Sequence, residues 1–278
     1  MAKNFFTVDE NFNKIIEETL NDEYENLEIQ KIINIPTGWT NIVYEVHTNK
    51  GDFFFRFPRD QFWERTIVKD YQFSKYINGK TNFKTVQLML KENKNRHFSV
   101  HKKIEGIPLA EKMDRLNSEE IKKVCMQIAQ FMYEIHNLEF KPEEIFSVNN
   151  IGLNLQDFIN ELLYLHVSDE DVKFWEKENF KSKSENYCLV HGDLNSSNIL
   201  LDENNNISAI IDFGFGGFGN KYYDISRIIG RCPQNYKEEI VNSYEYFEKY
   251  NLNKEEVDKN IRIWNNIDNG YINYMNGR

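Results

Sequence analysis

The feature that most constrains the fold is a group of three short apolar segments in the second half of the chain, with polar residues at fixed places between them. Residues 187–190, 199–201 and 207–211 are short and apolar, which predicts β-strands. Residues 202–206 are rich in Asp and Asn and predict a turn, so the last two strands should form a hairpin. The polar residues 191–198 lie on the loop before this hairpin. The sequence therefore predicts a rigid β scaffold with reactive groups on a loop and at a strand end.

These polar residues have the composition that phosphoryl transfer needs. Residues 191–198 read His-Gly-Asp-Leu-Asn-Ser-Ser-Asn, and residues 212–214 read Asp-Phe-Gly. The Asp193 carboxylate can take a proton from a hydroxyl, and the Asn198 amide oxygen and Asp212 carboxylate can hold Mg²⁺. Phosphoryl transfer passes through a loose transition state that is stabilised mainly by positioning and charge neutralisation. Each motif is common alone, but their order and their placement against strands favour this chemistry.

The pattern resembles the aminoglycoside phosphotransferase and choline kinase-like family, the small-molecule kinases with a protein-kinase-like fold. In that family, His-Gly-Asp-x-x-x-x-Asn stands where protein kinases have His-Arg-Asp-x-x-x-x-Asn. The resemblance implies that Asp193 is the catalytic base and that Asn198 and Asp212 are metal ligands. It also implies that His191 braces the loop rather than reacts. Residues 187–226 carry most of the resemblance.

The resemblance implies an α+β, bilobal protein-kinase-like fold, with a β-rich N-lobe and a mainly helical C-lobe. Residues 1–104 are expected to form the nucleotide-binding lobe, and residues 105–278 the catalytic and substrate-binding lobe. Residues 105–109 read Glu-Gly-Ile-Pro-Leu and match the crossing between the lobes. Periodicity predicts helices at 8–20, 62–77 and 121–135 and strands at 27–35, 42–46, 53–57 and, as a pair, within 86–104. Before the third helix, Asn117 with Glu120 three residues later predicts the N-cap.

The resemblance also places a nucleotide. The turn at residues 38–41 lies where the family has its nucleotide loop, so Thr40 and Asn41 are expected near the phosphates, where backbone N–H groups can bind oxygen. Taken alone, a turn with one glycine is better explained as an ordinary hairpin turn, but the motif at residues 191–198 favours phosphate contact. The base is expected against backbone groups near Lys102 and Ile104. Because backbone contacts leave no side-chain signature, ATP and GTP remain equally open as donors.

Arg56 departs from the kinase pattern. Kinases have a lysine on this third strand, where it binds phosphates and pairs with a helix glutamate. An arginine keeps the charge but presents a planar fork instead of a compact ammonium. The residue that aligns with the glutamate is Asp70, with Glu64 as the alternative, and Arg56 could also pair elsewhere on the surface.

Composition limits the partners. With a net charge of −10 and a pI near 5.2, the chain is not expected to bind nucleic acid. No apolar run approaches the roughly 20 residues of a membrane helix, and the first residues do not resemble a signal peptide. The chain has three widely spaced cysteines, Cys125, Cys188 and Cys232, and this spacing argues against a disulfide framework and against a zinc site. We therefore expect a cytoplasmic enzyme, monomeric or homodimeric, without a membrane partner.

Residues 139–171 contain eight carboxylates, and their only Lys or Arg is Lys141. In aminoglycoside phosphotransferases the corresponding region helps to build the acceptor site, and those acceptors are polyamines. Clustered carboxylates would concentrate a cationic acceptor by focusing negative potential. The alternative is a solvated acidic face on a helix at residues 155–166.

The residues after the Asp-Phe-Gly motif depart from the family again. Residues 215–219 hold three glycines between aromatic residues, which suggests a mobile loop or a wall of the acceptor pocket. Residues 220–226 resemble the family's Asp-Pro-x-Tyr-Asp-Leu-Ala, so Asp224 is expected to cap the next helix or brace the 191–198 loop.

The sequence therefore predicts a Mg²⁺-dependent phosphotransferase that moves the γ-phosphate of ATP or GTP to a hydroxyl of a small cationic molecule, with an aminoglycoside antibiotic favoured. The alternatives are a kinase for choline, ethanolamine, a sugar or a macrolide, and a nucleotide-binding pseudokinase. Arg56 and the loop after Gly214 motivate the pseudokinase, whereas retention of Asp193, Asn198 and Asp212 disfavours it. A protein kinase is disfavoured because little chain follows Asp212 and no Ala-Pro-Glu segment occurs.

Overall fold

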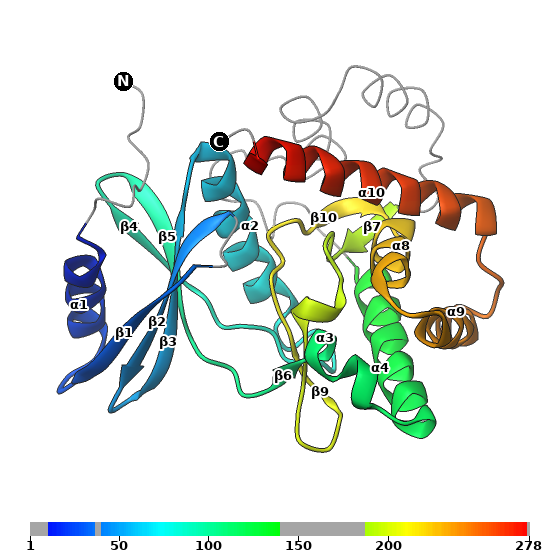
Figure 1. Cartoon of the computed structure of the whole chain (residues 1–278), viewed down its shortest axis with the longest axis horizontal. Coiled ribbons are helices and arrows are strands. Elements are labelled where there is room, and N and C mark those ends of the chain that lie inside the picture. Colours follow the sequence, from blue (N-terminus) through cyan, green and yellow to red (C-terminus); the bar gives the residue numbers. More distant parts are fainter. Residues whose placement is uncertain (1–10, 37–39, 140–186, 277–278) are drawn as a thin grey trace.

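The structure is a computed structural model that describes residues 11–36, 40–139 and 187–276 (Figure 1). It has a mixed α/β architecture, with an antiparallel sheet in the N-terminal part and mainly helices in the C-terminal part. Nearly all of the predicted acidic segment, including the expected helix at 155–166, lies outside the described residues. The same is true of the glycine in the predicted nucleotide turn.

The N-terminal sheet has five antiparallel strands in the order β1-β2-β3-β5-β4. The strands are β1 (Ile29–Ile35), β2 (Asn41–Thr48), β3 (Gly51–Pro58), β4 (Met89–Asn93) and β5 (Arg96–Lys102). This confirms the predicted strands, including the pair around residues 94–95. Lys94 and Asn95 both have positive φ, which closes the β4–β5 hairpin with the right-handed twist that such turns allow.

Strand β3 separates the two faces of this sheet. Phe53, Phe55 and Phe57 are fully buried on one face, and Phe54 and Arg56 point to the other because side chains alternate along a strand. Helix α1 (Phe12–Glu23) covers the first face, and helix α2 (Gln61–Ile77) lies on the other side of the sheet (Figure 1). The buried phenylalanines and α1 form one hydrophobic core. Arg56 is therefore directed toward α2.

The C-terminal part begins with a short strand and is then mainly helical. Its elements are β6 (Ile107–Pro108), α3 (Leu109–Lys112), α4 (Ser118–His136), β7 (Tyr187–Val190), β8 (Ile199–Leu201), β9 (Ile207–Ile210), β10 (Gly217–Asn220), α8 (Tyr222–Arg231), α9 (Gln234–Glu248) and α10 (Lys254–Asn276). The predicted start of α4 is confirmed, because Asn117 and Glu120 form a reciprocal capping box. No described helix is long and apolar enough to cross a membrane.

A second hydrophobic core supports the functional loop. Buried residues of α4, α8 and α9 pack together with residues of β7, β8 and β9, and the end of α2 also joins this core. Strands β6, β8 and β9 form a small sheet, which confirms the predicted β8–β9 hairpin. The division of the chain between residues 104 and 105 stays a prediction.

Of the two alternatives for residues 215–219, the loop is wrong for the second half, and the wall of an acceptor pocket stays a prediction. Residues 217–220 form strand β10, which pairs antiparallel with β7 from Gly217 opposite Val190 to Asn220 opposite Tyr187. Gly216, just before this strand, packs closely, since a Cβ on it would lie 2.9 Å from the Phe213 carbonyl oxygen.

Candidate active site

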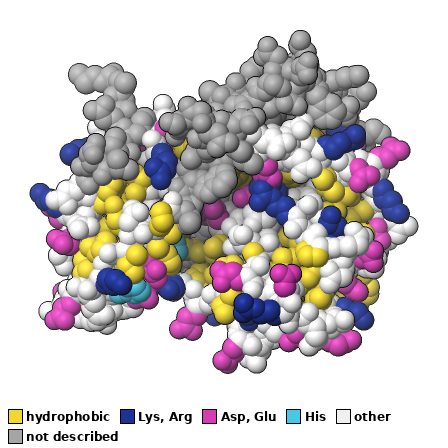
Figure 2. Space-filling model, in the orientation of Figure 1, with side chains coloured by type: hydrophobic (Ala, Val, Ile, Leu, Met, Phe, Trp, Pro, Cys, Tyr) yellow, Lys and Arg dark blue, Asp and Glu magenta, His cyan; other side chains and the backbone are white. Residues whose placement is uncertain are grey.

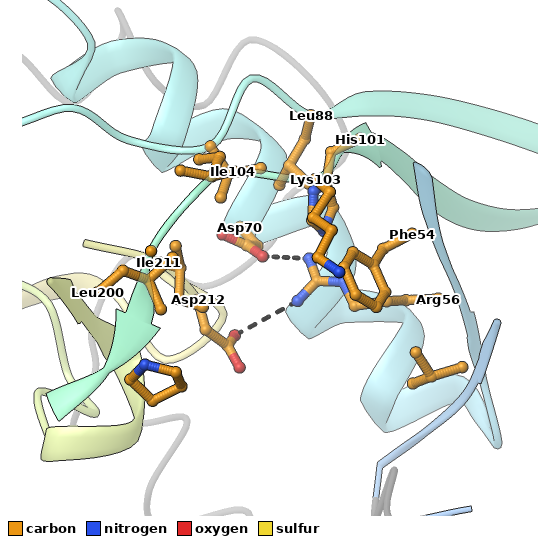
Figure 3. A pocket seen from close by; sticks show the side chains of 14 residues that line it. Phe54, Arg56, Asp70, Leu88, His101, Lys103, Ile104, Leu200, Ile211 and Asp212 are labelled. Atoms are coloured by element: carbon orange, nitrogen blue, oxygen red, sulfur yellow. Dashed lines mark hydrogen bonds and ion pairs between the residues drawn. The ribbon is translucent and has the colours of Figure 1, made fainter. Parts of the chain in front are cut away.

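A cavity of about 390 Å³ lies between the N-terminal sheet and the β8–β9 hairpin (Figure 3). Its walls are mainly apolar and include Val43, Leu88, Ile104 and Leu200. Charged side chains gather at one end, where Arg56, Asp70 and Asp212 point toward one another (Figure 3). An apolar slot with a few convergent polar groups is the usual form of a small-molecule site.

Arg56 pairs with Asp70 and not with Glu64, the other partner that the sequence left open. The Nη2 group of Arg56 forms an ion pair with Asp70, and its Nε donates to Ser99 Oγ at 3.1 Å. Its Nη1 lies 3.7 Å from Asp212 Oδ1. Burial alone would lower the pKa of Arg56, but the neighbouring Asp70 and Asp212 carboxylates raise it overall, so the guanidinium stays charged.

Glu64, the alternative partner for Arg56, contacts His97 instead. It is buried, and its Oε1 accepts from the His97 N–H at 2.8 Å, which ties α2 to β5. Asp70 lies further along α2 and also reaches the Asp-Phe-Gly segment, because its Oδ1 accepts from the Phe213 N–H at 2.9 Å. Asp70 therefore joins Arg56 of the sheet to the segment that carries Asp212.

The 191–198 loop connects β7 to β8 and places Asp193 beside Asn198. Asn198 Nδ2 donates to the Asp193 carbonyl oxygen at 3.0 Å and lies 3.5 Å from Asp193 Oδ2. The Ile211 N–H donates to the Asn198 carbonyl at 3.0 Å, which brings the end of the hairpin to the loop. The three residues predicted for catalysis and metal binding thus come from adjoining segments.

His191 braces this loop, as the resemblance implied. It is fully buried, and the Asp193 N–H donates to its Nδ1 at 3.2 Å. This bond assigns the proton to Nε2, which lies 3.0 Å from the Ile211 carbonyl oxygen. Both ring nitrogens are therefore used in positioning.

Asp224 braces the same loop from the first turn of α8. Its Oδ2 accepts from the His191 N–H and its Oδ1 from the Gly192 N–H, both at 2.8 Å. Asp224 is fully buried, and His136 Nε2 lies 3.1 Å from its Oδ2. This confirms the predicted bracing role.

Asp212 faces the cavity from a strained backbone position. Its φ is +65°, in the left-handed region that non-glycine residues rarely adopt. Burial raises the pKa of Asp212; Arg56 opposes this effect, and the nearby Asp70 and Asp193 carboxylates reinforce it. Strained residues cluster at functional sites, so this geometry agrees with a functional Asp212.

The predicted base-binding residues divide between the cavity and its surroundings. Ile104 lines the cavity, whereas the Lys102 ammonium lies over the rings of Tyr24 and Phe53, on the core side of the sheet. His101 lines the cavity, and its Nδ1 lies 2.9 Å from the Lys102 carbonyl oxygen. Burial lowers the pKa of His101 to about 4, and Arg56 adds to this effect.

Asn41 is the first residue of β2 and Thr40 precedes it, and neither is among the described residues that line the cavity. Asn41 is buried, and its Nδ2 donates to Thr40 Oγ1 at 2.8 Å. Their contact with phosphate stays a prediction.

Sequence reasoning missed Arg227. Its Nε donates to Asp193 Oδ1 at 2.6 Å, and its Nη1 contacts both carboxylate oxygens of Asp268, at 3.0 and 2.8 Å. A signal was available: Arg227 follows Asp224 by three residues on a predicted helix, and residues at this spacing share a face. A helix that braces the loop with Asp224 therefore also presents Arg227 near it.

Three features of this fold and site are those of the protein-kinase-like phosphotransferases. They are the ion pair of Arg56 with Asp70, the loop that carries Asp193 and Asn198, and the aspartate of the Asp-Phe-Gly segment. A model described as the phosphotransferase enzyme family matches residues 31–251. The chain belongs to this family. Members of the family with the protein-kinase-like fold are small-molecule kinases.

Solved structures with this fold cover almost the whole chain. The GDP and kanamycin complex of APH(2″)-IIIa has 20% sequence identity and a TM-score of 0.67, over 91% of this chain and 89% of that one. The macrolide 2′-phosphotransferase MphH from Brachybacterium faecium has 11% identity and a TM-score of 0.65, over 95% and 94%. The mouse serine/threonine-protein kinase SIK1 is 26% identical over 164 residues. That match spans 56% of this chain and 20% of the kinase.

Proposed function

We propose that the protein transfers the γ-phosphoryl group of ATP or GTP to a hydroxyl of a small molecule, with Mg²⁺ as cofactor. The observation that carries the proposal is the meeting of Arg56, Asp70 and Asp212 at one end of an apolar cavity, next to the loop that holds Asp193. Family membership supports the same reaction class.

The cavity suits a nucleotide in one orientation. The apolar side chains near Ile104 and Leu200 can sandwich a flat base, and the charged end then receives the phosphates. Arg56 stays charged and is fixed by Asp70 and Ser99, so its guanidinium is preorganised toward phosphate oxygens. Relatives crystallised with GDP and ADP support a nucleotide donor.

The residues present fit a magnesium ion. Mg²⁺ prefers oxygen ligands, and Asp212 offers a carboxylate that faces the cavity. Asn198 commits its amide nitrogen to the Asp193 carbonyl, which leaves the amide oxygen as the ligand atom. When bound, the cation would neutralise negative charge on the phosphate oxygens.

Asp193 is the proposed base. Its side chain is partly exposed, which lets an acceptor hydroxyl approach, and its backbone is held by His191 and Asn198. Oriented this way, it would accept the hydroxyl proton as the oxygen attacks the phosphorus, a role that depends on position more than on strong basicity.

An aminoglycoside is the leading acceptor. The APH(2″)-type relatives include complexes with kanamycin, streptomycin and gentamicin. The eight carboxylates of residues 139–171 would supply the negative potential that attracts a polyamine. On the face seen in Figure 2, described acidic and basic side chains are interspersed, so this argument rests on that segment. A macrolide is the second candidate, favoured by two macrolide 2′-phosphotransferases with TM-scores of 0.65.

The test measures nucleotide consumption by purified protein with Mg²⁺ and ATP or GTP, against aminoglycosides, macrolides, choline and simple sugars. Acceptor-dependent turnover with an aminoglycoside would support the leading proposal, and mass spectrometry would locate the phosphate. Asp193→Asn should abolish turnover while nucleotide affinity changes by less than a few-fold. Nucleotide binding without turnover on every acceptor would favour the pseudokinase.

A further inference from the structure

Asp193 has two unequal carboxylate oxygens. Oδ1 accepts a hydrogen bond from Arg227 Nε at 2.6 Å, whereas Oδ2 lies 3.5 Å from Asn198 Nδ2. A carboxylate that is free to rotate presents either oxygen to an acceptor, and only some orientations allow proton transfer. A charged, short contact on one oxygen removes this freedom.

We propose that Arg227 is a positioning residue for phosphoryl transfer: it holds Oδ1 of Asp193 so that Oδ2 receives the proton of the acceptor hydroxyl. This inference rests on the proposed function. In the step, the hydroxyl O–H bond breaks as its oxygen bonds to the γ-phosphorus. The proton goes to Oδ2, and the bond from phosphorus to the nucleoside diphosphate breaks.

Arg227 is itself held on three sides, as a positioning group must be. Its Nη1 contacts both oxygens of Asp268 on α10, and its guanidinium carbon lies 4.4 Å from the centre of the Trp264 ring. Its side chain is 8% exposed. Burial alone would lower the pKa of Arg227, but Asp193 and Asp268 raise it overall, so the charge persists.

Asp268 shares the positive charge of Arg227 with Asp193. The Arg227 guanidinium bonds to both carboxylates, so it is not committed to Asp193 alone. Asp268 is compensated in turn by Arg231, so the four side chains together are neutral. The arrangement thus holds the Asp193 carboxylate in a network that is anchored on α10.

The neighbouring Arg231 provides a matched control. It also bonds to Asp268, one helical turn after Arg227, but its side chain is about half exposed. Its described ion pair is with Asp268 and not with Asp193. Loss of Arg231 therefore removes a link between α8 and α10 and leaves the contact with Asp193 in place.

The experiment compares Arg227→Gln, Arg227→Lys and Arg231→Gln in two ways. Steady-state kinetics on the acceptor found by the panel above should show kcat reduced about 100-fold in Arg227→Gln, with the nucleotide KM within twofold, because small misplacements of reacting groups cost about this much. Arg227→Lys should recover part of kcat, and Arg231→Gln should keep it. Equal kcat in Arg227→Gln and Arg231→Gln, whatever the change in melting temperature, would overturn the proposal.

Crystal structures of the wild type and Arg227→Gln give a readout that needs no turnover. The proposal expects the Asp193 carboxylate to rotate or become disordered in the variant while the backbone of residues 191–198 stays in place. An unmoved carboxylate would overturn the positioning role. If the wild type phosphorylated nothing, the proposed function would fail, and these structures would still decide the role of Arg227.

Discussion

Gly192 gives a direct test of how the 191–198 loop is held, because its backbone admits no side chain. Its φ is +80°, and a Cβ there would lie 2.0 Å from the Phe215 carbonyl oxygen. That is about 1 Å inside the shortest contacts that Cβ atoms make. The obstacle is backbone, which cannot rotate away, so Gly192→Ala must displace the loop.

Two contributions determine the effect on stability. The left-handed conformation costs a non-glycine residue about 1–2 kcal/mol. Displacement of the loop also breaks the 2.8 Å bond from Gly192 N–H to Asp224, and a hydrogen bond to a charged group contributes about 1.5–3 kcal/mol. Gly192→Ala should therefore lower the free energy of unfolding by about 2.5–5 kcal/mol. Turnover should fall about 100-fold, because Asp193 is the next residue.

Gly79 provides the control, since its φ is +75° and no atom of the described residues lies within 4 Å of the position that a Cβ would take. Gly79→Ala carries the conformational strain alone and should cost about 1–2 kcal/mol without loss of turnover. Urea unfolding of both variants isolates the steric contribution at Gly192. A difference below about 1 kcal/mol between them would refute the reasoning, because backbone strain would then account for the whole effect.

Three further predictions concern the cavity. Arg56→Lys cannot bond Asp70, Ser99 and Asp212 together, so the nucleotide KM should rise about tenfold in steady-state assays; an unchanged KM would contradict the phosphate role. Asp212→Asn removes a carboxylate ligand, so calorimetry with and without EDTA should show that Mg²⁺ no longer strengthens nucleotide binding; a retained Mg²⁺ effect would place the ion elsewhere. Burial lowers the pKa of His101 to about 4, so between this value and the ordinary 6.5 the unfolded chain binds more protons than the folded one. Stability is therefore lost as pH falls from about 6.5 to 4, and His101→Gln should flatten this part of the pH dependence in urea unfolding; parallel curves would show that His101 does not contribute.

Sequence predicted the site best where its parts are local. Asp193, Asn198 and Asp212 are each placed by a strand a few residues away, so their proximity follows from the β8–β9 hairpin. The capping box of α4 was predictable for the same reason, because Asn117 and Glu120 interact within one turn.

The sequence could not predict contacts between segments that lie far apart along the chain. Both Glu64 and Asp70 lie on α2, and only the rotation of this helix against the sheet decides which one reaches Arg56. The glycines of residues 215–219 suggested a mobile loop, but Gly217 and Gly219 lie in strand β10, which pairs with β7, and a sequence pattern does not join these two strands. Arg227 contacts Asp193 across 34 positions, and only its spacing from Asp224 indicated this.

The charges at the cleft explain why a cation is expected beside Asp212 and not beside Asp193. Arg227 contacts Asp193 directly, whereas Arg56 forms its ion pair with Asp70 and lies 3.7 Å from Asp212. Asp212 is thus the less compensated carboxylate, and burial with its acidic neighbours raises its pKa in spite of Arg56. A divalent cation would supply further positive charge there. On this proposal, one arginine positions the base, and the less compensated carboxylate stands where the cation would bind.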